Sequence, residues 1–392
     1  MDSWLSQYGK SLHLIAGMNL PFFLLALLSE QAIGVWNGHK DRGSILTANQ
    51  QPYEVVLIRT YNPTDEMIAR MKRMEKQSGR KVFVSLQDNS HMLIVEDLLK
   101  SVEAAASSPD AHEHLLATLP NRFSRILTRN SSESVRKFIP ENINDIAEAL
   151  VATAHQKLLR NFPGKVIQYS DEDVDRYFPE LGKRGCSRDR INRHTYGWQF
   201  HEECIYTVFK NYEKQFHKPF PTEAGLWVME DDVEYTGNWK EFFDRYAGSA
   251  DLVTSLVKST TSEYFTKHMG VALPCTQSFI DQFVHNKKIL PEEEIGRMYH
   301  HAEHVVFYSG KLRKVMDKFQ LQKGHHYKSE FSTATFAKAM GFSIMDINKD
   351  DIWIQNGSQG RKGFVGRKID KNSVEELRRS NISPGLLHPC KY

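Results

Sequence analysis

The fold is decided by residues 54–86, EVVLIRTYNPTDEMIARMKRMEKQSGRKVFVSL. The apolar run Glu54–Thr60 is typical of a strand buried on both faces. Thr64 suits a helix N-cap, the apolar residues after it mark one helix face, and Gly79 predicts the helix end. Lys81–Leu86 predicts a second strand. Strand, helix and strand in so short a space form a βαβ unit, so we expect an α/β fold with a mainly parallel sheet flanked by helices.

The composition is that of an ordinary globular chain. The 392 residues suffice for one large domain with insertions or for two smaller domains. A net charge of +3 is too small to argue for nucleic acid as a partner. The four cysteines show no C-x-x-C spacing, which excludes a zinc ribbon or a thioredoxin-type centre and leaves their pairing open.

The N-terminus carries the segment best suited to enter a membrane. Ser11–Leu28 has 18 residues without Asp, Glu, Lys or Arg, and spans about 27 Å as a helix. We expect a signal anchor, with a cleaved signal peptide or a buried amphipathic helix as alternatives. The first two lead to the secretory pathway, either as a single-pass type II protein of the Golgi or ER membrane with its main domain in the lumen, or as a secreted protein. Sequons at Asn130, Asn356 and Asn381 agree with that location.

The expected organisation is residues 1–34 as anchor or signal peptide, 35–52 as stem, and 53–392 as one α/β domain. Residues 96–161 read as helical segments inserted beside the sheet, broken at Ser107–Pro109, Asn130–Ser132 and Pro140. The later elements predicted are strands over Lys165–Tyr169, Gly270–Leu273 and Phe342–Ile347, and helices over Thr195–Phe216, Gln277–His285 and Phe331–Met340.

The most informative stretch for function is Leu226–Trp239, LWVMEDDVEYTGNW. A buried-strand pattern runs directly into Glu230, Asp231 and Asp232. Three adjacent carboxylates at the carboxyl end of an inner strand repel one another and lie where open α/β sheets bind ligands. Such a cluster suits a hard divalent cation whose open positions accept phosphate oxygens. The alternative is a solvated turn before a helix over Asn238–Tyr246.

The βαβ unit and the acidic triplet together resemble a known enzyme family. The βαβ start, followed by an acidic triplet that closes an inner strand, resembles the GT-A fold of nucleotide-sugar-dependent glycosyltransferases, whose D-x-D motif occupies that place. The local E-D-D version is most similar to N-acetylglucosaminyltransferases of the type that initiate complex N-glycans. The resemblance covers about residues 53–89 and 197–256. Elsewhere only the order of elements agrees.

The resemblance implies a role for individual residues. Asp232 resembles the direct Mn²⁺ ligand, Asp231 would face the ribose or a metal-bound water, and Glu230 would approach the donor sugar. Asp88, in Val84–Asp88 at the end of the second strand, would lie near the uracil. Arg59, at the end of the first strand, would lie near the nucleotide.

An inverting transferase needs a carboxylate that accepts the proton of the acceptor hydroxyl. Glu330 is the first candidate, because it opens a helix that is followed by an apolar strand, an order that resembles the family's catalytic-base helix. A first-turn Glu that merely favours the helix dipole is the alternative. Glu303 is the second candidate.

Further signals near these residues are weaker. His300 and His304, four residues apart, could share a helical face as zinc ligands, with an ordinary polar face or part of an acceptor site as the alternatives. His201–Ile205 begins like a zincin helix but lacks its second histidine. The basic loop Gly357–Lys368 suits either a diphosphate or solvent. His388 is a candidate for the C-terminal metal histidine that some GT-A enzymes carry.

The sequence thus predicts a glycosyltransferase dependent on Mn²⁺ or Mg²⁺. It would move a sugar from a nucleotide-diphosphate donor, with a UDP-sugar favoured, to a hydroxyl of a glycan or glycoprotein, and the resemblance implies inversion. Two alternatives stay open. One is a metal-dependent hydrolase that uses Glu230–Asp232 with the histidines around His301, and the other is a non-catalytic glycan-binding protein of the same fold.

Overall fold

The computed structural model describes residues 54–61, 63–87, 90–105, 108–127, 132–183, 196–261, 277–288, 290–347, 371–380 and 384–388. By its contacts the chain divides into residues 1–51 and 52–392, and every described residue belongs to the second unit. Several predicted features lie outside the described residues: Ser11–Leu28, Asp88, the strand over Gly270–Leu273, the loop Gly357–Lys368, and the sequon asparagines. Among the helices of the described part, none combines the length and the apolar character that crossing a membrane requires.

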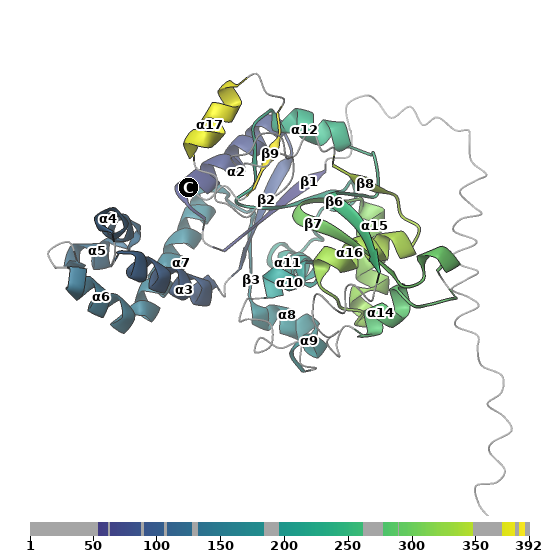
Figure 1. Ribbon diagram of the computed structural model, residues 1–392, viewed down its shortest axis with the longest axis horizontal. Coiled ribbons are helices and arrows are strands. Elements are labelled where there is room, and N and C mark those ends of the chain that lie inside the picture. Colours follow the sequence, from purple (N-terminus) through teal and green to yellow (C-terminus); the bar gives the residue numbers. More distant parts are fainter. Residues whose placement is uncertain are drawn as a thin grey trace, which may run out of the picture. The chain divides into compact units, whose positions relative to one another are not determined.

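A seven-stranded sheet organises the described residues, in the order β3-β2-β1-β4-β7-β6-β8 (Figure 1). Strands β1 with β2, β1 with β4, β2 with β3, and β6 with β8 are parallel, whereas β7 is antiparallel to both of its neighbours. The strands are β1 Val55–Thr60, β2 Lys81–Gln87, β3 Val166–Tyr169, β4 Leu226–Glu230, β6 Leu252–Thr261, β7 Arg297–Tyr308 and β8 Ile344–Asp346. The expected α/β fold with a mainly parallel sheet flanked by helices is confirmed.

The first βαβ unit forms as the sequence predicts. Helix α2, Asp65–Ser78, begins after Thr64, whose side-chain oxygen accepts a hydrogen bond from the Met67 amide at 3.2 Å. It ends at Gly79, whose φ of 66° lies in the left-handed region that glycine adopts without strain. These two caps fix where β1 stops and β2 starts, and so they place the carboxyl end of β1.

Both faces of the sheet are covered by helices, as Figure 1 shows. Because successive strand residues point to opposite faces, Val55 and Leu57 pack on one side while Val56 and Ile58 pack on the other. The first side is covered mainly by α11, His201–Phe216, and α16, Ser329–Ala339. The second is covered mainly by α2 and by α12, Trp239–Tyr246. The strands are therefore buried on both faces, as their continuous apolar runs predict.

The remaining elements complete the domain. The predicted insertion is helical in the described residues and has an apolar core of its own, which includes Ile94, Leu115 and Ile146. Its helices are α3 Ser90–Ala105, α4 Pro109–Thr118, α5 Asn121–Leu127, α6 Ser132–Glu141 and α7 Ile143–Asn161. Strand β5, Glu234–Tyr235, pairs with β9, Leu386–Leu387. The other helices are α8 Asp171–Tyr177, α9 Pro179–Lys183, α10 Tyr196–Gln199, α14 Gln277–Phe283, α15 Gly310–Phe319 and α17 Lys371–Arg379.

Two predicted helices need correction. The helix expected over Thr195–Phe216 is interrupted at Phe200, because the His201 amide donates a hydrogen bond to Ser329 Oγ at 2.6 Å and the Phe200 ring is buried in the core. The helical zinc pair of His300 and His304 is wrong, because both residues lie in β7, which is paired along its two edges with β4 and β6. The two histidines are four residue steps apart along the strand, a distance of about 13 Å, which is too far to share one ion.

Candidate active site at the carboxyl ends of β1 and β4

The candidate site lies where two parallel strands end together. Arg59 of β1 is in register with Glu230 of β4. From β1 the chain continues to β2 on one side, whereas β4 lies on the other, so the carboxyl ends of β1 and β4 form a topological switch point. Open α/β sheets bind ligands at such points. Asp231 and Asp232 follow β4 directly and therefore stand at this position.

Two residues of β1 hold the first part of the acidic triplet. Arg59 Nη2 contacts Glu230 Oε1 at 3.1 Å, and Arg59 Nη1 donates a hydrogen bond to the Gly197 carbonyl at 3.4 Å. The Thr60 hydroxyl donates to the Asp231 carboxylate, and the Asp231 amide donates to the Arg59 carbonyl at 3.2 Å. Burial, followed by the charge of Asp232, raises the pKa of Asp231 to about 7. Asp231 is thus fixed against the end of β1.

Two histidines converge on the other side of Glu230. His304 Nδ1 lies 2.6 Å from Glu230 Oε2, and His388 Nε2 lies 2.9 Å from the same oxygen. His388 Nε2 also lies 3.1 Å from Asp232 Oδ1. The two imidazole rings are stacked, with centroids 3.7 Å apart. One ligand atom each from Glu230, His304 and His388 lies within 4.8 Å of the others, a spacing suited to one metal ion.

The charges at this cluster favour a cation. Burial alone would raise the pKa of Glu230, but His304, His388 and Arg59 hold it well below its ordinary range. Burial likewise opposes protonation of His388, yet hydrogen bonds to Asp232 and Glu230 raise its pKa to about 9. At neutral pH an imidazolium therefore stands between two carboxylates, in a position that a divalent cation would suit. Carboxylate oxygens with imidazole nitrogens fit Mn²⁺ or Zn²⁺ better than Mg²⁺, which prefers oxygen ligands.

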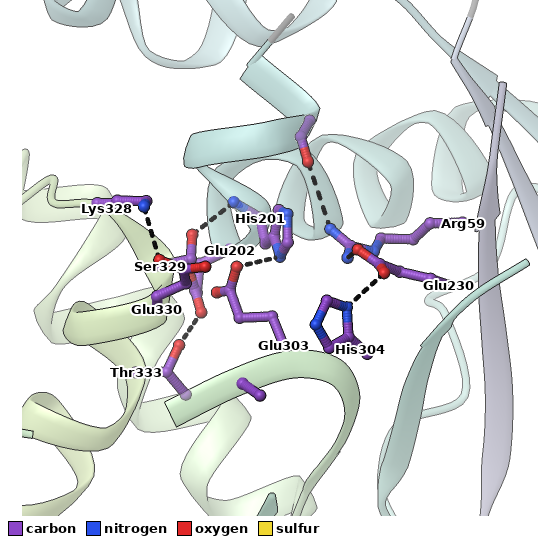
Figure 2. Close-up of polar contacts among 12 residues, drawn as sticks. Arg59, His201, Glu202, Glu230, Glu303, His304, Lys328, Ser329, Glu330 and Thr333 are labelled. Carbon is purple, nitrogen blue, oxygen red and sulfur yellow. Dashed lines mark hydrogen bonds and ion pairs between the residues drawn. The ribbon is translucent and has the colours of Figure 1, made fainter. Parts of the chain in front are cut away.

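Glu303, the second catalytic candidate, lies on β7 beside His304 in the sequence. Its Oε2 atom contacts His201 Nδ1 at 2.7 Å, where α11 begins. Its Oε1 atom is buried and has no hydrogen-bond partner. Burial, followed by the charge of Glu202, raises the pKa of Glu303 well above its ordinary range, and Glu330 and Glu230 add to the effect. Figure 2 shows the Glu303 side chain between the Arg59–Glu230 pair and the start of α16.

Glu330, the first catalytic candidate, lies in the first turn of α16. One-third of its side chain is exposed, and its Oε2 atom contacts Lys328 Nζ at 2.6 Å. The preceding residue, Ser329, accepts the hydrogen bond of the His201 amide. The starts of α11 and α16 are thereby held together, and Glu330 lies on the same side of Glu303 as Ser329 (Figure 2). The negative charge of Glu330 contributes to the raised pKa of the buried Glu303, so the two carboxylates interact electrostatically.

A buried acidic pair lies behind Glu303. Glu202 and Glu203 are fully buried at the start of α11. Glu202 accepts hydrogen bonds from Thr333 and Tyr308, and Glu203 Oε1 lies 2.8 Å from His326 Nδ1. Burial, followed by the charge of Glu203, raises the pKa of Glu202 to about 7. The start of α11, which fails as a zincin motif, is thus a buried hydrogen-bonded network next to the site.

The structure therefore brings together Arg59, Glu230, Asp231 and Asp232 with Glu303, and places Glu330 nearby. Sequence reasoning missed His304 as a partner of Glu230 and His201 as a partner of Glu303. Neither contact can be predicted from a local sequence pattern. The two residues of each pair are far apart in the sequence and meet only through the packing of the sheet and its helices. No protein-family model matches the chain, and no curated protein matches it. The function is therefore inferred from the geometry of the site.

Proposed function

We propose that the protein is a divalent-metal-dependent glycosyltransferase with a GT-A-type fold. It would transfer a sugar from a nucleoside-diphosphate donor, with a UDP-sugar favoured, to a hydroxyl of a glycan or glycoprotein. The observation that carries the proposal is the position of the acidic triplet. Glu230–Asp232 close β4 at the switch point of the sheet, and the imidazoles of His304 and His388 converge on the same carboxylates.

The cation would be held by Asp232, Glu230 and His388, with His304 as the fourth donor. When bound, a divalent cation offsets the charge of the donor diphosphate and of the departing nucleotide. Arg59, the register partner of Glu230, keeps a guanidinium beside the carboxylate and limits the repulsion that an anionic donor meets there. Asp231, bound to Thr60, would orient the donor from the end of β1.

Glu330 suits the role of proton acceptor better than Glu303. A base must be ionised and within reach of the acceptor hydroxyl. Burial favours the neutral form of Glu303, which is bound to His201, so Glu303 would position a sugar hydroxyl through its unpartnered Oε1 atom. Glu330 is partly exposed and contacts Lys328, so it is open to an acceptor hydroxyl. Inversion at the transferred carbon remains part of the proposal.

A metal-dependent hydrolase is the second candidate, and one observation favours it. Glu230, His304 and His388 form a set of one carboxylate and two imidazoles, which also suits a catalytic zinc with an open position for water. Such an enzyme would release its product to water and would need no acceptor.

We further propose a lumenal location, with the N-terminal segment Ser11–Leu28 as a signal anchor. Modification of the sequon at Asn130, read as a mass shift that is lost after enzymatic deglycosylation, would support this location. An unmodified full-length chain recovered from cytosol would reject it.

A nucleotide-sugar panel separates the proposals. Each donor is incubated with the protein and Mn²⁺, with and without pooled glycan acceptors, and both free sugar and extended glycan are measured. We expect extension of glycans with one donor, slow donor hydrolysis without acceptor, and loss of both in Asp232→Asn. Asp244→Asn is the matched control, because Asp244 lies on the exposed face of α12 and contacts Lys240 and Arg80. Zinc-dependent hydrolysis unaffected by acceptor would favour the hydrolase, and binding without turnover would favour a glycan-binding protein.

A further inference from the structure

Residues 371–380 and 384–388, together called segment 371–388, lie late in the sequence, and the second of these stretches reaches the candidate site. It contains α17, and its strand β9 pairs antiparallel with β5, so that Glu234 is opposite Leu387 and Tyr235 opposite Leu386. Leu386 and Leu387 are fully buried. The next residue, His388, contacts both Glu230 and Asp232. A long-range segment therefore supplies one of the donors at the proposed cation site.

Glu234 holds this segment in place through an unusually dense set of charges. Its carboxylate is 1% exposed, and guanidinium groups of three arginines surround it. Arg70 Nε lies 3.8 Å away, Arg73 forms a closer contact, and Arg378 Nη2 lies at 3.0 Å. Arg70 and Arg73 belong to α2, whereas Arg378 belongs to α17. Glu234 thus joins the segment to the first βαβ unit, two residues after Asp232.

Steric fit at the same place supports the junction. A Cβ atom added to Gly237 would lie 2.6 Å from Cβ of Pro384 and 2.8 Å from the Tyr235 ring, so a side chain at residue 237 would collide with both. The Thr236 amide donates to the Gly385 carbonyl at 3.1 Å, and the Gly385 amide donates to the Thr236 hydroxyl at 2.9 Å. The turn after the acidic triplet and the residues before His388 are therefore built to fit each other.

We propose that Glu234 is a positioning residue. Through Arg378 and the β5–β9 pairing it seats segment 371–388, so that His388 reaches Glu230 and Asp232. Cation binding and seating of the segment then strengthen each other, because a coupling between two equilibria is reciprocal. This inference rests on the proposed cation site, and it adds that formation of that site is controlled by a distant segment.

The test measures cation affinity in the full chain. Free Mn²⁺ is titrated by electron paramagnetic resonance for the unmodified protein, Arg378→Ala, Arg379→Ala, His388→Ala and the double variant of Arg378 and His388. Arg379 is the matched control, because it neighbours Arg378 on α17 but pairs with Glu375 rather than with Glu234. We expect Arg378→Ala to weaken Mn²⁺ binding about 10-fold, as loss of outer-shell support does in metal sites, and Arg379→Ala to leave it unchanged.

The double variant tests whether the contact of Arg378 with Glu234 acts through His388. We expect Arg378→Ala to have no further effect on Mn²⁺ affinity once His388 is replaced. Hydrogen exchange at residues 384–388 should slow when Mn²⁺ binds, and this slowing should vanish in His388→Ala. If Arg378→Ala unfolds the protein by circular dichroism, Gly237→Ala replaces it, because that change displaces Pro384 without altering charge.

Two results would overturn the inference. One is unchanged Mn²⁺ affinity in Arg378→Ala, or in Gly237→Ala where it takes that variant's place, although hydrogen exchange shows a loosened segment. The other is an equal loss of Mn²⁺ affinity with and without His388. The same experiments distinguish failure of the proposed function from failure of this inference. If Mn²⁺ binding depends on Arg378 but the protein neither binds nor turns over any nucleotide sugar, the inference is supported and the transferase is rejected.

Discussion

Glu230 contacts side chains from three other parts of the chain. One oxygen contacts Arg59 of β1, and the other contacts His304 of β7 and His388 after β9. The sequence identifies Glu230 because it belongs to three adjacent carboxylates at the end of a buried strand. It does not identify the two histidines, because their approach depends on strand order and on a segment that returns from the far end of the chain.

Replacement of Glu330 by Gln should separate binding from chemistry. Glutamine keeps the shape of the side chain but cannot accept a proton, so we expect turnover to fall about 10²–10⁴-fold while donor affinity stays constant. Glu375→Gln on the exposed part of α17 is the control and should retain full turnover. If donor affinity falls and turnover of the bound complex does not, the proton acceptor lies elsewhere and Glu303 becomes the next residue to test.

Glu202 should make stability depend on pH. Its pKa is raised from 4.5 to about 7 in the folded protein, so between these values the folded state keeps a proton that the unfolded chain has lost. The free energy of unfolding should therefore decrease as pH rises from about 4.5 to about 7, by roughly 3 kcal/mol. Urea unfolding across this range should show a shallower decrease for Glu202→Gln than for the unmodified protein. Identical pH profiles would contradict the raised pKa.

Among the helices and strands, the sequence predicts those whose boundaries depend on contacts between residues close in the sequence. The boundaries of α2 follow from Thr64 and Gly79, and the buried strands β1, β2 and β4 follow from their apolar runs. The sequence does not predict strands β6 and β7. Strand β6 is rich in Ser and Thr, β7 contains three histidines, and the two form strands through pairing with each other and, for β7, with β4. The same pairing explains why the expected helix around His300 is a strand.

The N-cap of α2 offers a direct test of this local control. Thr64→Ala removes the oxygen that accepts the Met67 amide hydrogen bond, so we expect a loss of about 1 kcal/mol in the free energy of unfolding. Thr64→Ser keeps the hydroxyl and should retain most of the stability. Urea denaturation measures both variants, and equal stabilities for Ala and Ser would show that the side-chain cap contributes nothing.

In the domain as a whole, the order of the strands brings residues that are far apart in the sequence close together at one site. The triplet on β4, the base candidate on α16 and the imidazole of His388 come from separate elements, and the fold places them around the carboxyl ends of β1 and β4. The sequence predicted the triplet and its chemistry from composition and position. It did not predict the buried network of Glu303 with His201, because neither residue has a local pattern that points to the other.

We propose that a divalent cation held at Glu230 and Asp232 is required for binding of a nucleoside diphosphate donor. Calorimetric titration of UDP into the unmodified protein, Asp232→Asn and the control Asp244→Asn, each with Mn²⁺ and with excess chelator, tests it most directly. We expect UDP to bind the unmodified protein and the control with Mn²⁺ and to lose most of its affinity with chelator, because the carboxylates then repel the diphosphate. Asp232→Asn should bind UDP weakly and with little response to Mn²⁺. UDP affinity of the unmodified protein that is the same with Mn²⁺ and with chelator, or UDP affinity of Asp232→Asn with Mn²⁺ that equals that of the unmodified protein, would contradict this proposal.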